Sequence, residues 1–169
     1  SKGFGPRGKR TEVLEEITLE VEAGEFLAII GYSGAGKTTP MSLLAGLIKP
    51  DAGSIKLHGK PMEGPGPDRG IVFQNYSLLP WLTVFENIYL GREIRKRSGL
   101  LDWRAMHEGA RGLLKRFEVE VDVREPLMNF STAIRQMVAI ARAVSFEARL
   151  VIMDEPTSSL DEAEVRILF

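Results

Sequence analysis

The segment 31–38 carries residue types that can bind a nucleoside triphosphate. It fits the pattern G-x-x-x-x-G-K-[ST] at every fixed position and follows a continuous apolar run. Glycines allow backbone N–H groups to close around a phosphate without Cβ clashes. The lysine brings a point charge to the β- and γ-phosphates, and the threonine hydroxyl is a ligand for Mg²⁺. The sequence therefore predicts a site for ATP and Mg²⁺ that contains Gly31, Ser33, Gly34, Gly36, Lys37, Thr38 and Thr39.

Three polar residues that could serve hydrolysis follow two other apolar runs. Asp154 and Glu155 come after residues 150–153, and Gln74 comes after residues 70–73. The carboxyl end of a buried strand is where open α/β sheets bind their ligands. Asp154 is suited to hold Mg²⁺ and Glu155 to act as general base toward water, while Gln74 could both coordinate Mg²⁺ and orient the water. The alternative is a solvated acidic pair and an ordinary loop glutamine.

Pro40 lies in the first turns of the helix that should follow the glycine-rich loop. Proline has no N–H group, and it disfavours helical backbone angles at Thr39. We expect a locally strained helix start that still binds ATP.

The elements that must position these residues alternate between strands and helices. Apolar runs predict buried strands at 26–30, 70–73 and 150–153, alternation predicts a half-buried strand at 13–21, and a short strand is expected at 54–57. Apolar residues at helical spacing predict helices behind Thr39, over 83–94, 102–117 and 131–144, and from Asp161 onward. Asp102 and Ser131 are the expected N-caps of two of them. This pattern predicts an α/β domain with a mostly parallel sheet. We expect an N-terminal antiparallel β portion with the phosphate-binding core at 1–82, an inserted helical subdomain at 83–147, and a last strand with its following loop at 148–169.

Composition narrows the class of protein further. The chain has 169 residues, 44% of them apolar and 27% charged, which is enough for one globular domain. The formal net charge of -1 gives no reason to expect nucleic acid as a partner. The lack of cysteine excludes disulfides and thiolate metal sites. No apolar stretch approaches the ~20 residues that span a bilayer, so work at a membrane would require another subunit.

Together these motifs resemble the ATP-binding cassette family, in order and over almost the whole chain. Segment 31–39 is similar to the family's Walker A motif, Gln74 to its Q-loop, 153–156 to Walker B with the catalytic glutamate, and 159–161 to the D-loop. Residues 129–144 occupy the place of the signature helix. The resemblance implies a P-loop ATPase fold, roles at the nucleotide for Ser131 and Asp161, and an aromatic stacked on adenine, for which Phe4 is the first candidate and Tyr32 the weaker one.

The resemblance also implies partners and a location. Two such domains would dimerise head to tail, with each ATP between the Walker motifs of one and the signature of the other. Hydrolysis would drive a transmembrane permease, contacted by the inserted helices and the Q-loop. The expected location is therefore the cytoplasm, at the inner face of the cell membrane through the permease, or in solution for an engineered fragment.

The chain departs from the family pattern in three ways. The signature usually reads L-S-G-G-Q, but here Thr132 and Ala133 replace the two glycines, so one composite site is expected to be weak or silent. The switch histidine is expected beyond the last residue. His58, expected on a strand, and His107, expected within a helix, do not take its place and are expected to be ordinary surface or packing histidines. The last part of the core sheet is expected beyond the chain as well, which implies an incomplete domain.

The two parts of the chain resemble different importers. Residues 11–90 resemble ATPases of nitrate and sulfonate-type importers, and residues from Gly91 onward resemble those of monosaccharide importers such as ribose or xylose systems. One hypothesis is a chimera with a junction between Val84 and Gly91. The sequence thus leaves two functions open: the Mg·ATP-hydrolysing subunit of an ABC importer, or an engineered or fragmentary module that binds ATP with little or no turnover.

Overall fold

The structure is a computed structural model, and it describes residues 1–6, 8–32, 34–73, 77–145, 148–154 and 162. The chain divides into two compact units, Ser1–Gly66 and Pro67–Phe169, and each is described by itself. In the described part, no helix is both long enough and apolar enough to cross a membrane.

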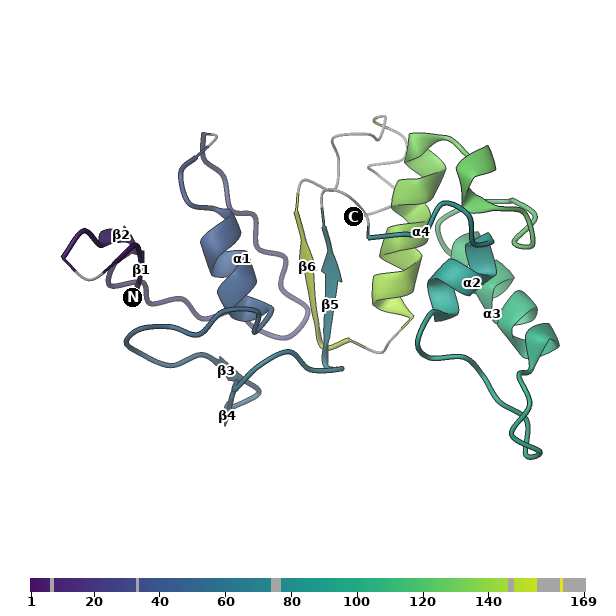
Figure 1. Ribbon diagram of the computed structural model, residues 1–169, viewed down its shortest axis with the longest axis horizontal. Helices are drawn as coiled ribbons and strands as arrows, with labels where there is room; N and C mark the ends of the chain where they lie inside the picture. Colours follow the sequence, from purple (N-terminus) through teal and green to yellow (C-terminus); the bar gives the residue numbers. More distant parts are fainter. Residues whose placement is uncertain (7, 33, 74–76, 146–147, 155–161, 163–169) are drawn as a thin grey trace. The chain divides into compact units, whose positions relative to one another are not determined.

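The first unit contains two small antiparallel hairpins and one helix (Figure 1). β1 (Lys2–Phe4) pairs with β2 (Thr11–Leu14), and β3 (Lys56–Leu57) pairs with β4 (Lys60–Pro61). The N-terminal antiparallel β portion is therefore present as predicted. α1 (Thr38–Leu44) follows the glycine-rich loop.

Asp51 ties the first hairpin to the segment behind α1. Its carboxylate accepts hydrogen bonds from the Gly3 N–H at 2.8 Å and the Lys2 ammonium at 3.0 Å, and it also pairs with the Arg10 guanidinium. These donors hold the pKa of the Asp51 carboxyl well below its usual range, the Gly3 N–H first among them.

Two strands predicted in the first unit differ from the structure. Residues 26–30 form no strand, and Ile30 is 93% exposed. Only Thr11–Leu14 of the predicted strand at 13–21 is a strand, and Ile17, Leu19 and Val21 are exposed. A strand forms only where a neighbour pairs with its backbone, and an apolar run does not say which neighbour that is. The parallel strand pair that the structure describes belongs to the second unit.

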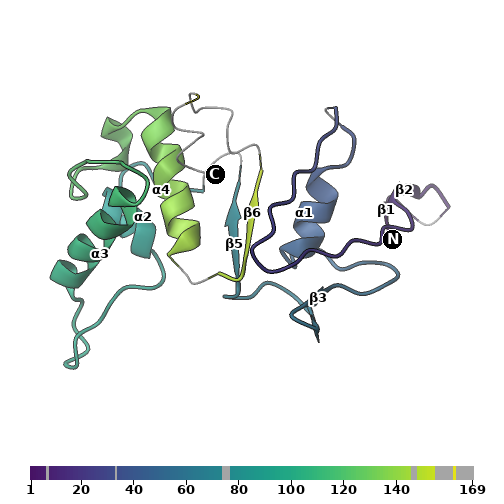
Figure 2. The same ribbon diagram turned by 180° about the vertical axis from the view of Figure 1, so that it is seen from behind.

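The second unit packs helices against a parallel strand pair. β5 (Arg69–Val72) and β6 (Leu150–Met153) are parallel, with Arg69 opposite Leu150 and Val72 opposite Met153. α4 (Thr132–Val144) lies between this pair and the helices α2 (Val84–Tyr89) and α3 (Trp103–Lys115), as Figures 1 and 2 show from opposite sides. A short 3₁₀ turn, η1 (Leu127–Asn129), precedes α4. The predicted strands at 70–73 and 150–153 are confirmed.

A capping residue precedes each of the helices α2, α3 and α4. Thr83 and Glu86 form a capping box at α2, the Asp102 carboxylate accepts the Ala105 N–H at α3, and the Ser131 hydroxyl accepts the Ile134 N–H at α4. The Asp102 and Ser131 caps were both expected from the sequence. α2 is shorter than predicted and ends before Gly91, which has a φ of 77°.

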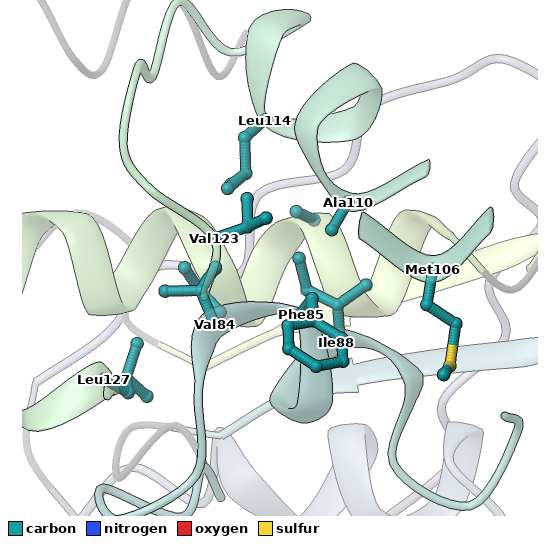
Figure 3. Close-up of a cluster of buried hydrophobic side chains, with 10 residues drawn as sticks. Val84, Phe85, Ile88, Met106, Ala110, Leu114, Val123 and Leu127 are labelled. Atoms are coloured by element: carbon teal, nitrogen blue, oxygen red, sulfur yellow. The ribbon is translucent and has the colours of Figure 1, made fainter. Parts of the chain in front are cut away.

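The core of the helical subdomain is one cluster of buried apolar side chains. Figure 3 shows residues of α2, α3 and the loop before η1 converging on it. The labelled members are Val84, Phe85, Ile88, Met106, Ala110, Leu114, Val123 and Leu127. A second cluster, formed by α4 side chains with Val72, attaches the subdomain to β5.

A buried amide fixes the loop that leads into α2. Asn87 has no exposed surface, and its Oδ1 accepts the Leu79 N–H at 2.8 Å. Its Nδ2 lies within hydrogen-bond distance of three carbonyl oxygens, those of Leu79, Leu82 and Thr83. A buried polar side chain is tolerated when it is paired in this way.

Candidate functional site: a phosphate-binding loop and a strand end

The glycine-rich loop is held by its own lysine. The Lys37 ammonium donates hydrogen bonds to the carbonyls of Gly31, at 2.7 Å, and Tyr32, at 2.9 Å. Two backbone bonds close the same loop, from the Ala35 N–H to the Tyr32 carbonyl and from the Thr39 N–H to the Gly36 carbonyl. The lysine of segment 31–38 is therefore bonded back onto the loop that precedes it.

Two of the glycines are required by conformation. Gly34 and Gly36 both have a φ of 82°, in the left-handed region that disfavours other residues. A Cβ on Gly36 would also lie 2.9 Å from Val13 Cγ1 of β2, so this position is closed to larger side chains. The sequence analysis missed Val13 as a support of the loop, because nothing in a strand-like segment indicates which loop packs on it.

Pro40 occupies a position in α1 that tolerates it. The helix begins at Thr38, so Pro40 lies in the first turn, where backbone N–H groups have no partner inside the helix. No hydrogen bond of the helix is lost. The strain that remains is the constraint which Pro40 places on Thr39.

Asp154 lies at the carboxyl end of β6. Its backbone N–H donates to the Val72 carbonyl at 2.9 Å, so it is the first residue past the end of the strand pair. Val72 is in turn followed by Phe73 and Gln74. Because the two strands are parallel, their carboxyl ends lie at the same edge of the pair. Gln74, Glu155, Asp161 and Ser33 lie outside the described residues.

Ser131 is exposed at the N-terminus of α4, where its Oγ accepts the Ile134 N–H at 3.3 Å. A hydroxyl can accept one hydrogen bond and donate another, so this cap leaves its proton available to a phosphate oxygen. Thr132 is exposed and Ala133 half-buried in the first turn behind it.

The remaining candidates have simple surroundings. Phe4 is 45% exposed on β1, with the Lys2 ammonium 5.6 Å from its ring centroid. His107 packs edge to face on Phe85, with ring centroids 4.3 Å apart, so it is a packing histidine as expected. His58 was expected on a strand, but it lies in the β3–β4 turn with a φ of 48°, because the tight turn to Gly59 needs left-handed backbone.

Two of the candidate residues carry oxygen donors that suit Mg²⁺. Thr38 offers a hydroxyl and Asp154 a carboxylate, and both are hard ligands of the kind that Mg²⁺ prefers. Within the described ranges, no group of three or more histidine, aspartate or glutamate residues could hold a metal on its own. The loop residues described, Gly31, Gly34, Gly36, Lys37, Thr38 and Thr39, lie in the first unit, and Asp154 and Ser131 lie in the second.

Comparison with known proteins identifies the class. Residues 14–158 match the family model described as ABC transporter. The chain belongs to the ABC transporter family. It is similar to two solved structures of the ATP-binding cassette MJ0796, both described as dimeric. The TM-scores are 0.82 and 0.83 at 27% identity, over 99% of this chain and 76% of theirs. The fold is therefore the α/β P-loop ATPase fold of these cassettes.

Among its relatives are ATP-binding proteins of sugar importers. The chain is 42% identical to a putative ribose/galactose/methyl galactoside import ATP-binding protein of Pseudomonas fluorescens, over 100% of this chain and 33% of the relative. It is 41% identical to the ribose import ATP-binding protein RbsA 1 of Streptomyces coelicolor, over 100% of this chain and 34% of the relative. The chain thus spans about a third of the length of these relatives. They align on both sides of Val84, so the nitrate- or sulfonate-type front part and the junction gain no support.

Proposed function

We propose that this chain binds Mg·ATP and hydrolyses it as part of an importer for a ribose-type sugar. The observation that carries the proposal is the loop at 31–38, where the Lys37 ammonium bonds to two loop carbonyls and Gly34 and Gly36 have left-handed backbone. The family match and the names of the ribose import relatives support the import role.

The proposal gives each candidate residue a role. Lys37 binds the β- and γ-phosphates among the backbone N–H groups of residues 31–39. Thr38, Asp154 and Gln74 hold Mg²⁺, which supplies charge neutralisation on the phosphates when bound. Glu155 accepts the proton of the attacking water, which Gln74 orients. Phe4 stacks on adenine.

The proposal includes two kinds of protein partner. Ser131 and Asp161 act across a head-to-tail dimer, where the α4 N-terminus of one copy approaches the nucleotide of the other. A transmembrane permease holds the chain at the inner face of the cell membrane. The dimeric cassette structures and the family match support these partners.

The test separates binding from turnover. Affinity for Mg·ATP is measured by titration calorimetry, and phosphate release is measured beside Glu155→Gln. Hydrolysis that falls at least about 100-fold in Glu155→Gln, with affinity kept, supports the proposal. Binding without turnover in the unaltered chain would instead favour a nucleotide-binding module.

Lys37→Ala serves as the matched control for the site itself. This variant should lose affinity for Mg·ATP whether the chain hydrolyses ATP or only binds it. It therefore checks only that the binding measured by calorimetry takes place at the loop. Unchanged affinity in Lys37→Ala would overturn the assignment of ATP to residues 31–38.

A further inference from the structure

The connection between α2 and α3 is a hairpin with a defined backbone. The Asp102 N–H donates to the Ile94 carbonyl and the Lys96 N–H to the Leu100 carbonyl, each at 2.8 Å. Arg95 and Leu101 form a β-bridge, and Gly99 completes the turn with a φ of 84°. Figures 1 and 2 show this segment, residues 94–102, projecting away from α2 and α3. It is called the basic hairpin below.

The base of the basic hairpin is fixed to the subdomain core. Ile94 and Leu101 pack against the buried cluster of Figure 3, and Asp102 caps α3. Because both strands of the hairpin are anchored at one end, its tip is presented at a fixed place relative to the helices.

Cations dominate the tip. Arg95, Lys96 and Arg97 are all exposed, in a chain whose formal net charge is -1. The Arg95 guanidinium donates to the Gly99 carbonyl at 3.1 Å. Among the described residues, neither Lys96 nor Arg97 forms an ion pair with a carboxylate. Their charge is therefore available to a ligand outside the chain.

Apolar side chains lie next to these cations. Leu100 is 69% exposed, although its neighbour Leu101 faces the core. Trp103 is 49% exposed, and its ring meets Phe85 edge to face at 5.9 Å, which holds the indole in place. Basic residues beside leucine and tryptophan match the chemistry of a membrane interface, where headgroups take the charge and the indole lies at headgroup depth.

We propose that the basic hairpin binds the surface of a membrane rich in anionic lipid. Lys96 and Arg97 meet the headgroups, while Leu100 and Trp103 enter the interface beside them. An acidic protein would also attract the cations. It would not account for a leucine exposed on a projecting turn and a tryptophan exposed where α3 begins, so the lipid surface is the better match.

Vesicle co-sedimentation tests this directly. The full chain is spun with vesicles of phosphatidylcholine containing about 30 mol% phosphatidylglycerol, and with phosphatidylcholine alone, in about 0.15 M salt. We expect binding to the anionic vesicles only, weakened in about 0.5 M salt. Lys96→Glu/Arg97→Glu should reduce partitioning at least ~10-fold, since each cation contributes on the order of fivefold near such a surface. Leu100→Ser, which leaves the charge of the hairpin unchanged, should also reduce partitioning into the anionic vesicles.

The matched control is Lys56→Glu/Lys60→Glu, which reverses two exposed cations on the β3–β4 hairpin. Equal loss in both double variants would overturn the proposal, because only net charge would matter. Absence of vesicle binding in the unaltered chain would overturn the proposal too. Binding to polyglutamate, a mimic of an acidic protein, without binding to vesicles would overturn it in favour of an acidic protein partner.

A spectroscopic readout locates the contact. In a Trp81→Phe background, the emission of Trp103 should shift to shorter wavelength on anionic vesicles, and an unchanged spectrum would contradict insertion. Affinity for Mg·ATP should be unchanged in the Lys96→Glu/Arg97→Glu variant. Failure of the lipid proposal can therefore be told apart from failure of the proposed function.

Discussion

Asp154 donates its backbone N–H to the Val72 carbonyl at 2.9 Å, which extends the β5–β6 ladder just beyond β6. The backbone of Asp154 thus takes part in the strand pairing, while its side chain, on a half-buried residue, lies at the end of the strand. A substitution of this side chain can therefore remove the carboxylate and keep the backbone hydrogen bond.

We predict that Asp154→Asn lowers Mg-dependent hydrolysis at least about 100-fold, because the variant loses a charged ligand of Mg²⁺. The free energy of unfolding should change by less than about 1 kcal/mol, since the backbone bond to Val72 is kept. Phosphate release and urea unfolding measure the two effects. Glu120→Gln, which alters an exposed carboxylate elsewhere, is the control. Full hydrolysis in Asp154→Asn would contradict the assignment.

Gly70 lets α4 approach β5. A Cβ at this position would lie 2.8 Å from the Ala143 carbonyl oxygen and 3.2 Å from its Cβ. Gly70→Ala should therefore destabilise the second unit by about 1–3 kcal/mol, as overpacking does. Gly112→Ala on α3 is the control, because a Cβ there meets nothing within 4 Å and alanine favours a helix. Equal stability of the two variants in urea would contradict this close packing.

Pro40 should be nearly neutral for stability. We expect Pro40→Leu to change the free energy of unfolding by less than about 1 kcal/mol and to leave ATP binding intact, since no helical hydrogen bond needs an N–H at residue 40. Ser42→Pro, in the next turn of α1, removes such a bond and should cost about 3 kcal/mol. Thermal unfolding compares the two. A large gain in stability from Pro40→Leu would show that Pro40 strains the backbone at Thr39 and would contradict the prediction.

The N-terminal hairpin should loosen in acid. The pKa of Asp51 is depressed in the folded state, so its contribution is present above the ordinary aspartate pKa of about 4 and is lost as pH falls below it. Asp51→Asn should therefore speed hydrogen exchange in β1 and β2 at pH 7, and the difference from the unaltered chain should narrow below about pH 4. Glu63→Gln in the same unit is the control. A difference independent of pH would mean that the carboxylate charge is not involved.

The sequence predicted the elements whose signals are local. Asp102 and Ser131 cap helices because a side-chain oxygen needs only the next turn of backbone. The runs at 70–73 and 150–153 became β5 and β6, which pair with each other. The glycine pattern located the loop that Lys37 closes.

Features that depend on distant neighbours were not predicted. The run at 26–30 has the composition of a buried strand, yet a strand also needs a pairing partner, which composition does not name. In the sequence, Asn87 looks like an ordinary asparagine on a helix surface. Only the structure shows that the loop at 79–83 surrounds its amide. Gly70 looks like an ordinary strand residue, and only the packing of α4 shows why it has no side chain.

The contacts of Lys37 bear on how fast and how tightly the loop takes up a nucleotide. Its ammonium already bridges the carbonyls of Gly31 and Tyr32, so the side chain loses little rotational freedom when a phosphate arrives. The incoming anion must instead compete with two carbonyl oxygens for the same protons. The lysine side chain is therefore preorganised, and its ordering costs little entropy when an anion binds. In return, the new bonds to the anion replace existing bonds to carbonyl oxygens, so only the difference between the two contributes to affinity.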